Sequence, residues 1–406
     1  MISVAEARSR ILQALEPMPA EQVGLSDGLG RVLARDVAAR RTQPPLAVSA
    51  MDGYAVRAAD VAALPARLAV IGYAPAGRAF AGTLAPGQAV RIFTGAPVPA
   101  GADAIVIQEN TEAAEDNHVT VVAGEAPPGR YVRPAGLDFS EGEVLLRAGR
   151  VLSARDLGLA AGMNVPWLMV RRQPRVAILA TGDEIVMPGE PIGADQIVSS
   201  NALALAGFVE ADGGIPVDLG IAPDSAEALK AIAAGARGTD LVITTGGASV
   251  GDHDLVRSVL GEIGLEVDFW RIAMRPGKPL IFGTLAGTPL LGLPGNPVSS
   301  LVCAVIFVRP ALAALLGADA RPGATETAIL GVDLAANDER EDYLRATLAR
   351  DEPGPMVATP FGIQDSSMFA NMARADCLVI RPPDAPAAPA GSMVEILPLG
   401  GGIRGI

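Results

Sequence analysis

The chain is poor in the residues that form covalent cross-links and zinc sites. Its 406 residues include two cysteines and two histidines. Cys303 and Cys377 stand far apart in apolar segments, so we expect two buried core thiols rather than a disulfide or a nucleophile. His118 stands in an acidic turn and is expected at the surface. Without a Cys/His cluster, a bound metal needs oxygen ligands, which favours Mg²⁺ over zinc.

Positive charge is also scarce. The formal net charge is −13, which argues against general binding to nucleic acid or to an anionic membrane surface. Among the 32 basic residues, the lysines are Lys230 and Lys278 alone. Lys278 lies in a Pro-Gly-Lys-Pro turn, which favours a functional role over a place on the solvated surface. An anionic ligand would need a local basic cluster or a metal to overcome the overall field.

An export signal and a long apolar span are missing. The first residues lack the apolar core of a signal peptide. The most apolar run, at 301–317, contains Arg309 and Pro310 and is short for a bilayer. We therefore expect a buried, kinked helix there, no membrane association and a cytoplasmic protein.

The order of periodic segments predicts several domains. Strand and helix patterns alternate at 175–316, as in a doubly wound parallel α/β sheet, whereas 49–125 shows short β-like runs between turns. Helices are expected from the capping box at Ser3 and Glu6 and over 29–39. We predict a multi-domain α/β plus β protein with four parts: a discontinuous elongated helical domain at 1–45 and 132–172, an inserted β-rich domain at 46–131, an α/β domain at 173–320 and a C-terminal all-β domain at 321–406.

Two apolar strands run directly into glycine-rich loops. The first loop begins at Gly246 and Gly247, and the second is PGNP at 294–297. Glycine lets backbone N–H groups approach an anion, and a helix that starts after such a loop adds the positive end of its dipole. Arg275 and Lys278 lie just upstream of the second loop. The pattern predicts an anion cradle with a cationic clamp.

Four acidic residues are expected at strand ends of the α/β segment: Glu184, Asp224, Asp252 and Asp254. Ligands of such sheets bind outside the carboxyl ends of the strands, and carboxylate oxygens suit Mg²⁺. Each residue alone could equally cap a helix or close a turn. As a set beside the glycine loops, they favour a metal and substrate site. His253, between two of the aspartates, could be a ligand or an acid–base group.

Two further segments lie outside the α/β part. Asp52 is followed by glycine, and Thr94 precedes Gly-Ala-Pro. Asp-Gly is first of all a tight-turn signal, so the residues alone leave open a turn or a ligand contact. Arg345 and Ser366 carry no distinguishing spacing.

Six segments, in order, resemble the MoeA-type molybdopterin molybdenumtransferases, the family that includes the gephyrin E domain. They are SAMDGYA (49–55), RIFTGAP (91–97), TGDE (181–184), TGGASVGD (245–252), RPGKP (275–279) and LPGNPVS (293–299).

The resemblance implies a MogA-like α/β domain and a C-terminal β-barrel-like domain. It implies a homodimer whose cleft lies between the α/β domain of one subunit and the β-rich domain of the other. The implied reaction joins molybdate to adenylated molybdopterin and releases AMP with Mg²⁺. Other proteins of cofactor biosynthesis or molybdoenzyme maturation would be its partners.

The resemblance also implies roles for single residues. Catalytic roles would fall to Asp52, Glu184, Asp254 and Lys278, and metal binding to Glu184, Asp252 and Asp254. Substrate-binding roles would fall to Thr94, Asp138, Asp224, Gly246, Gly247, Ser249, Arg271, Arg275, Pro294, Gly295, Asn296, Pro297, Arg345 and Ser366. Family members often carry lysine at the positions of Arg271 and Arg275, and arginine offers an oxyanion a two-pronged fork instead of a point charge.

Two other functions remain open. A related α/β domain adenylates molybdopterin, and that activity would consume ATP and release pyrophosphate. A non-catalytic scaffold would bind the cofactor without turnover.

Overall fold

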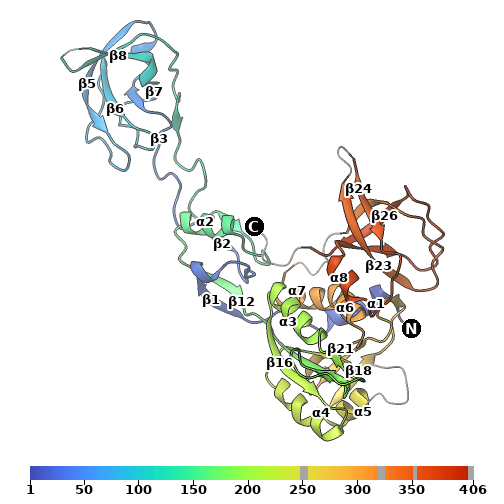
Figure 1. The fold of residues 1–406 in the computed structure, drawn as a ribbon. Helices are drawn as coiled ribbons and strands as arrows, with labels where there is room; N and C mark the ends of the chain where they lie inside the picture. The colour runs from blue at the N-terminus through green and yellow to red at the C-terminus, as the bar shows by residue number, and fades with distance from the viewer. Residues whose placement is uncertain (115, 247–254, 319–324, 351–353, 401–406) are drawn as a thin grey trace. The chain divides into compact units, whose positions relative to one another are not determined.

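The computed structural model describes residues 1–114, 116–246, 255–318, 325–350 and 354–400. The chain forms two compact units (Figure 1). The first comprises Met1–Arg35, Ala148–Arg155 and Trp167–Ile406, and the second Asp36–Arg147 and Asp156–Pro166. The finer division into four domains stays a prediction.

The α/β part of the first unit contains a six-stranded sheet. Its strand order is β16 (Ile215–Ala222), β13 (Arg175–Thr181), β17 (Leu241–Thr245), β21 (Thr288–Leu293), β20 (Ile281–Leu285) and β18 (Leu265–Phe269). The first four strands are parallel, and β20 and β18 are antiparallel additions. From β13 the chain passes to β16 on one side and then to β17 on the other. The doubly wound fold is confirmed, with its switch point between β13 and β17.

Helices cover both faces of this sheet (Figure 1). Val176 and Ile178 pack with α1 (Val4–Gln13), α3 (Asn201–Ala211), α6 (Pro297–Cys303) and α7 (Arg309–Leu315). Ala177 and Leu179 pack on the opposite face with α4 (Ala226–Ala233) and α5 (Leu255–Glu262). Side chains of a strand alternate between faces, so a strand covered on both faces is apolar throughout. This explains the uninterrupted apolar run of β13.

The most apolar helix lies inside this core. α6, a π-helical segment (Ala304–Val308) and α7 form one run, Pro297–Leu315, long and apolar enough to cross a membrane by length and composition. Most of it is buried within the protein, as predicted. Arg309 Nε donates to Asp212 Oδ1 at 3.1 Å and ties α7 to the end of α3. Burial raises the pKa of Asp212, and the Arg309 charge opposes that shift.

The C-terminal part is a closed barrel. Its strands pair in the ring β23 (Glu341–Arg350), β24 (Met356–Pro360), β22 (Glu326–Leu330), β26 (Met393–Pro398) and β25 (Cys377–Arg381), which returns to β23. The expected barrel-like domain is confirmed. β19 (Met274–Arg275), from the α/β segment, pairs with β23. α8 (Phe369–Arg374) follows the loop that contains Ser366.

The helix expected over 29–39 is wrong. Val32 and Leu33 instead form bridges to Val151 and Val170, and β2 (Val37–Ala38) pairs with β11 (Val144–Leu146). Nearby, β1 (Ala20–Gly24) pairs with β12 (Trp167–Arg171). Val32 and Leu33 are buried through this pairing with distant segments, so tertiary contacts override the local helical pattern.

The second unit contains the expected β-rich sheet. Its order is β7 (Ala104–Ile107), β4 (Gly53–Val56), β6 (Gln88–Ile92), β5 (Ala66–Ala74), β9 (His118–Val121) and β8 (Thr111–Ala114). Apolar clusters pack on both faces of it. Across both units, the remaining elements are α2 (Ala154–Gly162), the strands β3 (Val48–Ser49), β10 (Val132–Arg133), β14 (Ile185–Val186) and β15 (Ile197–Val198), and 3₁₀ turns at Leu25–Asp27, Ala58–Val61, Gln108–Asn110 and Ala234–Ala236.

Candidate functional site

A cavity of about 640 Å³ opens at the switch point of the α/β sheet. It lies beyond the carboxyl ends of β13, β17 and β21, where parallel sheets of this kind bind ligands. Its lining includes Glu184, Thr245, Gly246, Pro294, Gly295, Asn296, Pro297 and Ser367.

The two glycine loops meet in this cavity. Gly246 has φ +91°, and a Cβ there would lie 2.3 Å from the carbonyl oxygen of Thr181, so only glycine fits. A Cβ on Gly295 would lie 3.5 Å from the Cα of Gly246. Loops separated by almost fifty residues therefore present their backbones side by side. Gly247 and Ser249 lie outside the described residues.

Asn201 joins these loops and was missed by the sequence argument. Its Nδ2 donates to Thr245 Oγ1 at 2.9 Å and to the Gly295 carbonyl at 2.7 Å. From the pattern this residue is the start of α3. The sequence did offer one signal for this role: Asn201 has an amide side chain and stands at the first position of a helix that begins near the strand ends. Such a side chain can hold two neighbouring loops at a constant separation.

Carboxylates gather beside the cavity. A Cβ on Gly182 would lie 2.6 Å from Glu184 Oε2, so the carboxyl group folds back over glycine. Asp183 Oδ1 accepts a hydrogen bond from the backbone N of Asp224 at 2.8 Å. Burial, then the charges of Asp183 and Glu184, raise the pKa of Asp224. A group of neighbouring carboxylates is the electrostatic setting that a divalent cation relieves.

A complete metal-binding group is not formed by the described residues alone. They contain no set of three His, Cys, Asp or Glu side chains placed to hold an ion. Asp252, His253 and Asp254 lie outside the described residues. Of the three predicted metal ligands, the structure describes Glu184.

The three predicted clamp cations have different surroundings. Lys278 is exposed, and the next residue, Pro279, lines the cavity. The Arg271 guanidinium stacks on the Trp270 ring at 3.8 Å, and its buried Nε has no hydrogen-bond partner among the described residues. Arg275, in contrast, is already engaged in ion pairs.

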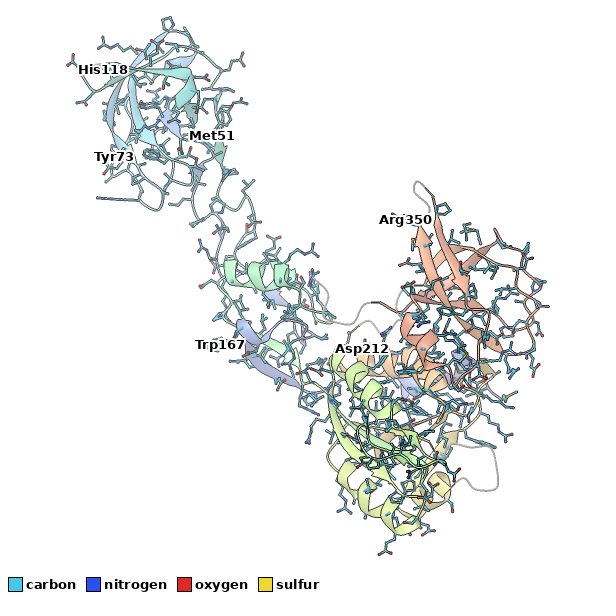
Figure 2. The ribbon with its side chains drawn as sticks, in the orientation of Figure 1. Met51, Tyr73, His118, Trp167, Asp212 and Arg350 are labelled. Atoms are coloured by element: carbon cyan, nitrogen blue, oxygen red, sulfur yellow. The ribbon has the colours of Figure 1, made fainter. Side chains whose placement is uncertain are left out.

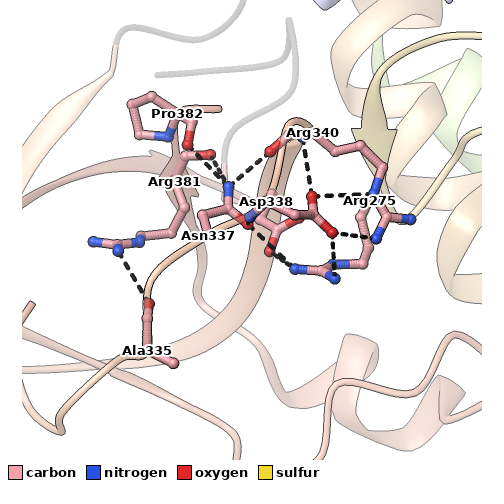
Figure 3. A network of polar contacts seen from close by, with 8 residues as sticks. Arg275, Ala335, Asn337, Asp338, Arg340, Arg381 and Pro382 are labelled. Atoms are coloured by element: carbon pink, nitrogen blue, oxygen red, sulfur yellow. Dashed lines mark hydrogen bonds and ion pairs between the residues drawn. The ribbon is translucent and has the colours of Figure 1, made fainter. Parts of the chain in front are cut away.

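Arg275 binds the C-terminal barrel (Figure 3). Its guanidinium donates to Asp342, to Asp338 at 3.3 Å and to Asn337 Oδ1 at 3.2 Å. Hydrogen bonds from Arg340 hold the pKa of Asp338 at about 2, with a further contribution from the Arg275 charge. Arg275 therefore links the α/β segment to the barrel in this conformation.

The loop before α8 brings Ser366 to the second glycine loop, whereas Arg345 lies on β23 and is not among the described residues that line the cavity. Asn296 Nδ2 donates to Ser366 Oγ at 2.9 Å, and the Val298 N–H donates to the Ser366 carbonyl at 3.2 Å. The backbone of Arg345 is held by both ends of the Gln364 amide at 3.0 Å. Its guanidinium is fully buried, yet none of its three nitrogens has a hydrogen-bond partner among the described residues.

Burial lowers the pKa of Arg345, opposed by the charge of Asp365. A buried cation is normally paired, because desolvation without a partner is costly. The orphaned guanidinium thus has the chemistry of a site for an anionic group.

In the second unit, Asp52 and Thr94 contact each other. Asp52 Oδ1 accepts from the Thr94 N–H at 2.7 Å and from Thr94 Oγ1 at 2.8 Å, and these bonds lower the pKa of Asp52. Asp138 lines a hollow of about 610 Å³ with Leu46 and Arg133. Asp52 therefore binds the turn that contains Thr94. A second role in ligand binding stays a prediction.

Three family models match the chain: the MoeA N-terminal region (domains I and II) at 2–163, a probable molybdopterin binding domain at 177–314, and the MoeA C-terminal region (domain IV) at 327–399.

Full-length relatives agree with these matches. The molybdopterin molybdenumtransferase of Haemophilus influenzae is 36% identical over 98% of both chains, and that of Bacillus subtilis is 33% identical over 98% of this chain and 94% of the relative. Two crystal structures of molybdopterin biosynthesis moeA proteins from Pyrococcus horikoshii superpose with TM-scores of 0.85 and 0.84 at 33% and 27% identity. They cover 99% and 98% of this chain, and the chain covers 100% and 99% of theirs.

Proposed function

Because the chain belongs to the MoeA family, we propose that it is a molybdopterin molybdenumtransferase of molybdenum cofactor biosynthesis. It inserts molybdate into adenylated molybdopterin and releases AMP. The observation that carries the proposal is the cavity at the switch point, where two glycine loops adjoin Glu184 and Asn296.

The substrate is a polyanion, and the site offers donors for it. Backbone N–H groups at Gly246 and Gly295 bind the phosphates. Lys278 and Arg271 hold molybdate and offset the charge that develops on the leaving AMP. Arg345 supplies a further, desolvated cation to molybdate, and Ser366, which accepts a hydrogen bond from Asn296, lies beside the second glycine loop.

Magnesium fits the donor chemistry of the acidic side. None of Asp183, Glu184 and Asp224 forms an ion pair with a described residue, and burial, followed by the charges of the other two, raises the pKa of Asp224. Glu184, Asp252 and Asp254 would hold Mg²⁺, which supplies charge neutralisation at the phosphoanhydride.

The reaction needs no protein nucleophile. An oxygen of water or molybdate attacks phosphorus, AMP leaves, and the residues contribute positioning and electrostatic stabilisation. Asp52 is the candidate base. Its lowered pKa makes it a weaker base. Asp52 therefore contributes to the rate by orienting the substrate as well as by accepting a proton.

The functional unit is a cytoplasmic homodimer with shared sites. Asp52, Thr94 and Asp138 of one subunit complete the α/β cavity of the other. Mixing inactive Asp52→Ala and Glu184→Ala subunits tests this: with shared sites, random exchange restores about a quarter of the native activity. If each site lay within one subunit, every subunit would lack one of the two residues, and no mixture would regain activity.

The activity is tested with purified adenylated molybdopterin and molybdate, with and without Mg²⁺, by following AMP release and cofactor formation. Glu184→Ala and Lys278→Ala should lose most turnover. Lys230→Ala is the matched control, because this other lysine pairs with Glu262 away from the cavity lining. Near-native rates in both test variants would remove those residues from the site.

The same assay separates the alternatives. ATP consumption with pyrophosphate release would identify an adenylyltransferase, and ligand binding without any turnover would identify a scaffold.

A further inference from the structure

We propose that the second compact unit carries a stacking surface for a fused heteroaromatic ring of the substrate. The surface consists of Tyr54, Tyr73, Arg91 and Phe93. The inference rests on the proposed function, since adenylated molybdopterin carries two such rings, the pterin and the adenine.

The sheet places these side chains together. Arg91 on β6 is in register with Tyr54 on β4 and with Tyr73 on β5, so the three residues project from the same face. The Arg91 guanidinium carbon lies 5.0 Å from the centroid of the Tyr54 ring and 5.1 Å from that of Phe93. Both distances are within the range of cation–π contacts.

The central guanidinium is held in place before any ligand arrives. Arg91 Nη1 donates to the Gly53 carbonyl at 3.2 Å, and Nη2 donates to Gln108 Oε1 at 2.6 Å. A planar cation fixed by two hydrogen bonds and two rings loses little freedom when a further ring stacks on the cluster.

The outer part of the cluster is open. Tyr73 is 63% exposed and Phe93 is 36% exposed, and Tyr73 lies on the surface of this unit (Figure 2). Aromatic residues make up 4% of the chain, yet two of its four tyrosines lie around this one arginine. Large exposed rings contribute little to a core, so the concentration is explained by a planar ligand that covers them.

The rim selects a ring that has amine groups on its edge. Thr94 follows Phe93 in the chain, and Asp52, two residues before Tyr54, uses Oδ1 for both hydrogen bonds from Thr94. Oδ2 has no hydrogen-bond partner in the part of the chain that the structure describes. A carboxylate oxygen accepts from the amino and ring N–H groups that pterins carry and from the amino group of adenine.

The test uses calorimetric titration of the full-length protein with two probes, AMP and 6-hydroxymethylpterin. Ribose 5-phosphate, which lacks the ring, is the ligand control. In Tyr73→Ser and Phe93→Ser the Kd for at least one ring probe should rise roughly tenfold or more. Tyr73→Phe, which keeps the ring, should bind as the native protein does. The probe whose affinity falls identifies the ring.

Both test residues are exposed, so the melting temperature should not change, and this is measured in parallel. Equal affinities of the native and serine variants for both probes, or no binding of either probe to the native protein, would overturn the inference. Molybdenum insertion by the native enzyme is assayed separately. Turnover without a dependence on the stacking surface refutes this inference alone, whereas ring binding that depends on the surface without turnover refutes the proposed function alone.

Discussion

Arg345→Met should stabilise the protein and abolish its activity. The native guanidinium is fully buried, its three nitrogens have no hydrogen-bond partner among the residues that the structure describes, and burial lowers its pKa. Leaving a buried polar group unpaired costs about 1–3 kcal/mol. Methionine fills much of the same space without that penalty, so unfolding of the barrel should cost about 1–3 kcal/mol more in the variant. If the barrel melts independently, each kcal/mol corresponds to about 4–8 °C.

Arg381→Met is the matched control. Arg381 is also a buried barrel arginine, but its Nη2 donates to the carbonyls of Ala335, at 3.2 Å, and Pro386. Removing it leaves two acceptors without their donor, so this variant should lose about 1–3 kcal/mol of stability. Its activity should persist in the fraction that remains folded.

Scanning calorimetry with and without molybdate decides the matter. A ligand at one hundred times its Kd stabilises the native state by about 2.7 kcal/mol, and Arg345→Met should lose this response. Two results together would refute the reasoning: Arg345→Met as unstable as Arg381→Met, and a molybdate response equal to that of the native protein. Arg345 would then be a structural residue.

Two other substitutions test the framework of the α/β part, one at the cavity and one at the opposite end of the strands. Asn201→Ala removes the bridge between the loops of Thr245 and Gly295, so KM should rise more than kcat falls; a fall in kcat with unchanged KM would contradict the bridging role. For Asp240, burial raises the pKa. Hydrogen bonds from Arg172 and from the backbone of residue 175 lower it by a larger amount, so the pKa in the folded state lies below that in the unfolded state. Its contribution is therefore present above about pH 4 and is lost as the pH falls through the folded pKa. Asp240→Asn should cost about 1 kcal/mol in urea unfolding at pH 7, and less with each step below pH 4; a difference that stays constant with pH would contradict the sign.

The spacing of apolar residues predicted secondary structure most reliably where a segment is apolar enough to be buried whatever its neighbours are. The apolar run of β13 and the alternation of strands and helices predicted a doubly wound sheet. The two glycine loops were predicted to form an anion cradle, and Gly246 does approach Gly295, because the parallel strands that precede them end at one edge. The helix expected over 29–39 failed, because Val32 and Leu33 are buried by strands far away in the chain.

The amino-acid sequence by itself determined the fold class, the edge of the sheet at which a ligand would bind and the residue types available there. These follow from backbone geometry and from the spacing of apolar residues, both of which are local. The tertiary structure alone decided that Arg275 is paired, that the buried Arg345 guanidinium has no partner in the described part of the chain, and that Asn201 bridges two loops. Pairing and burial depend on which distant groups come within a few ångströms, and no pattern along one segment contains that information.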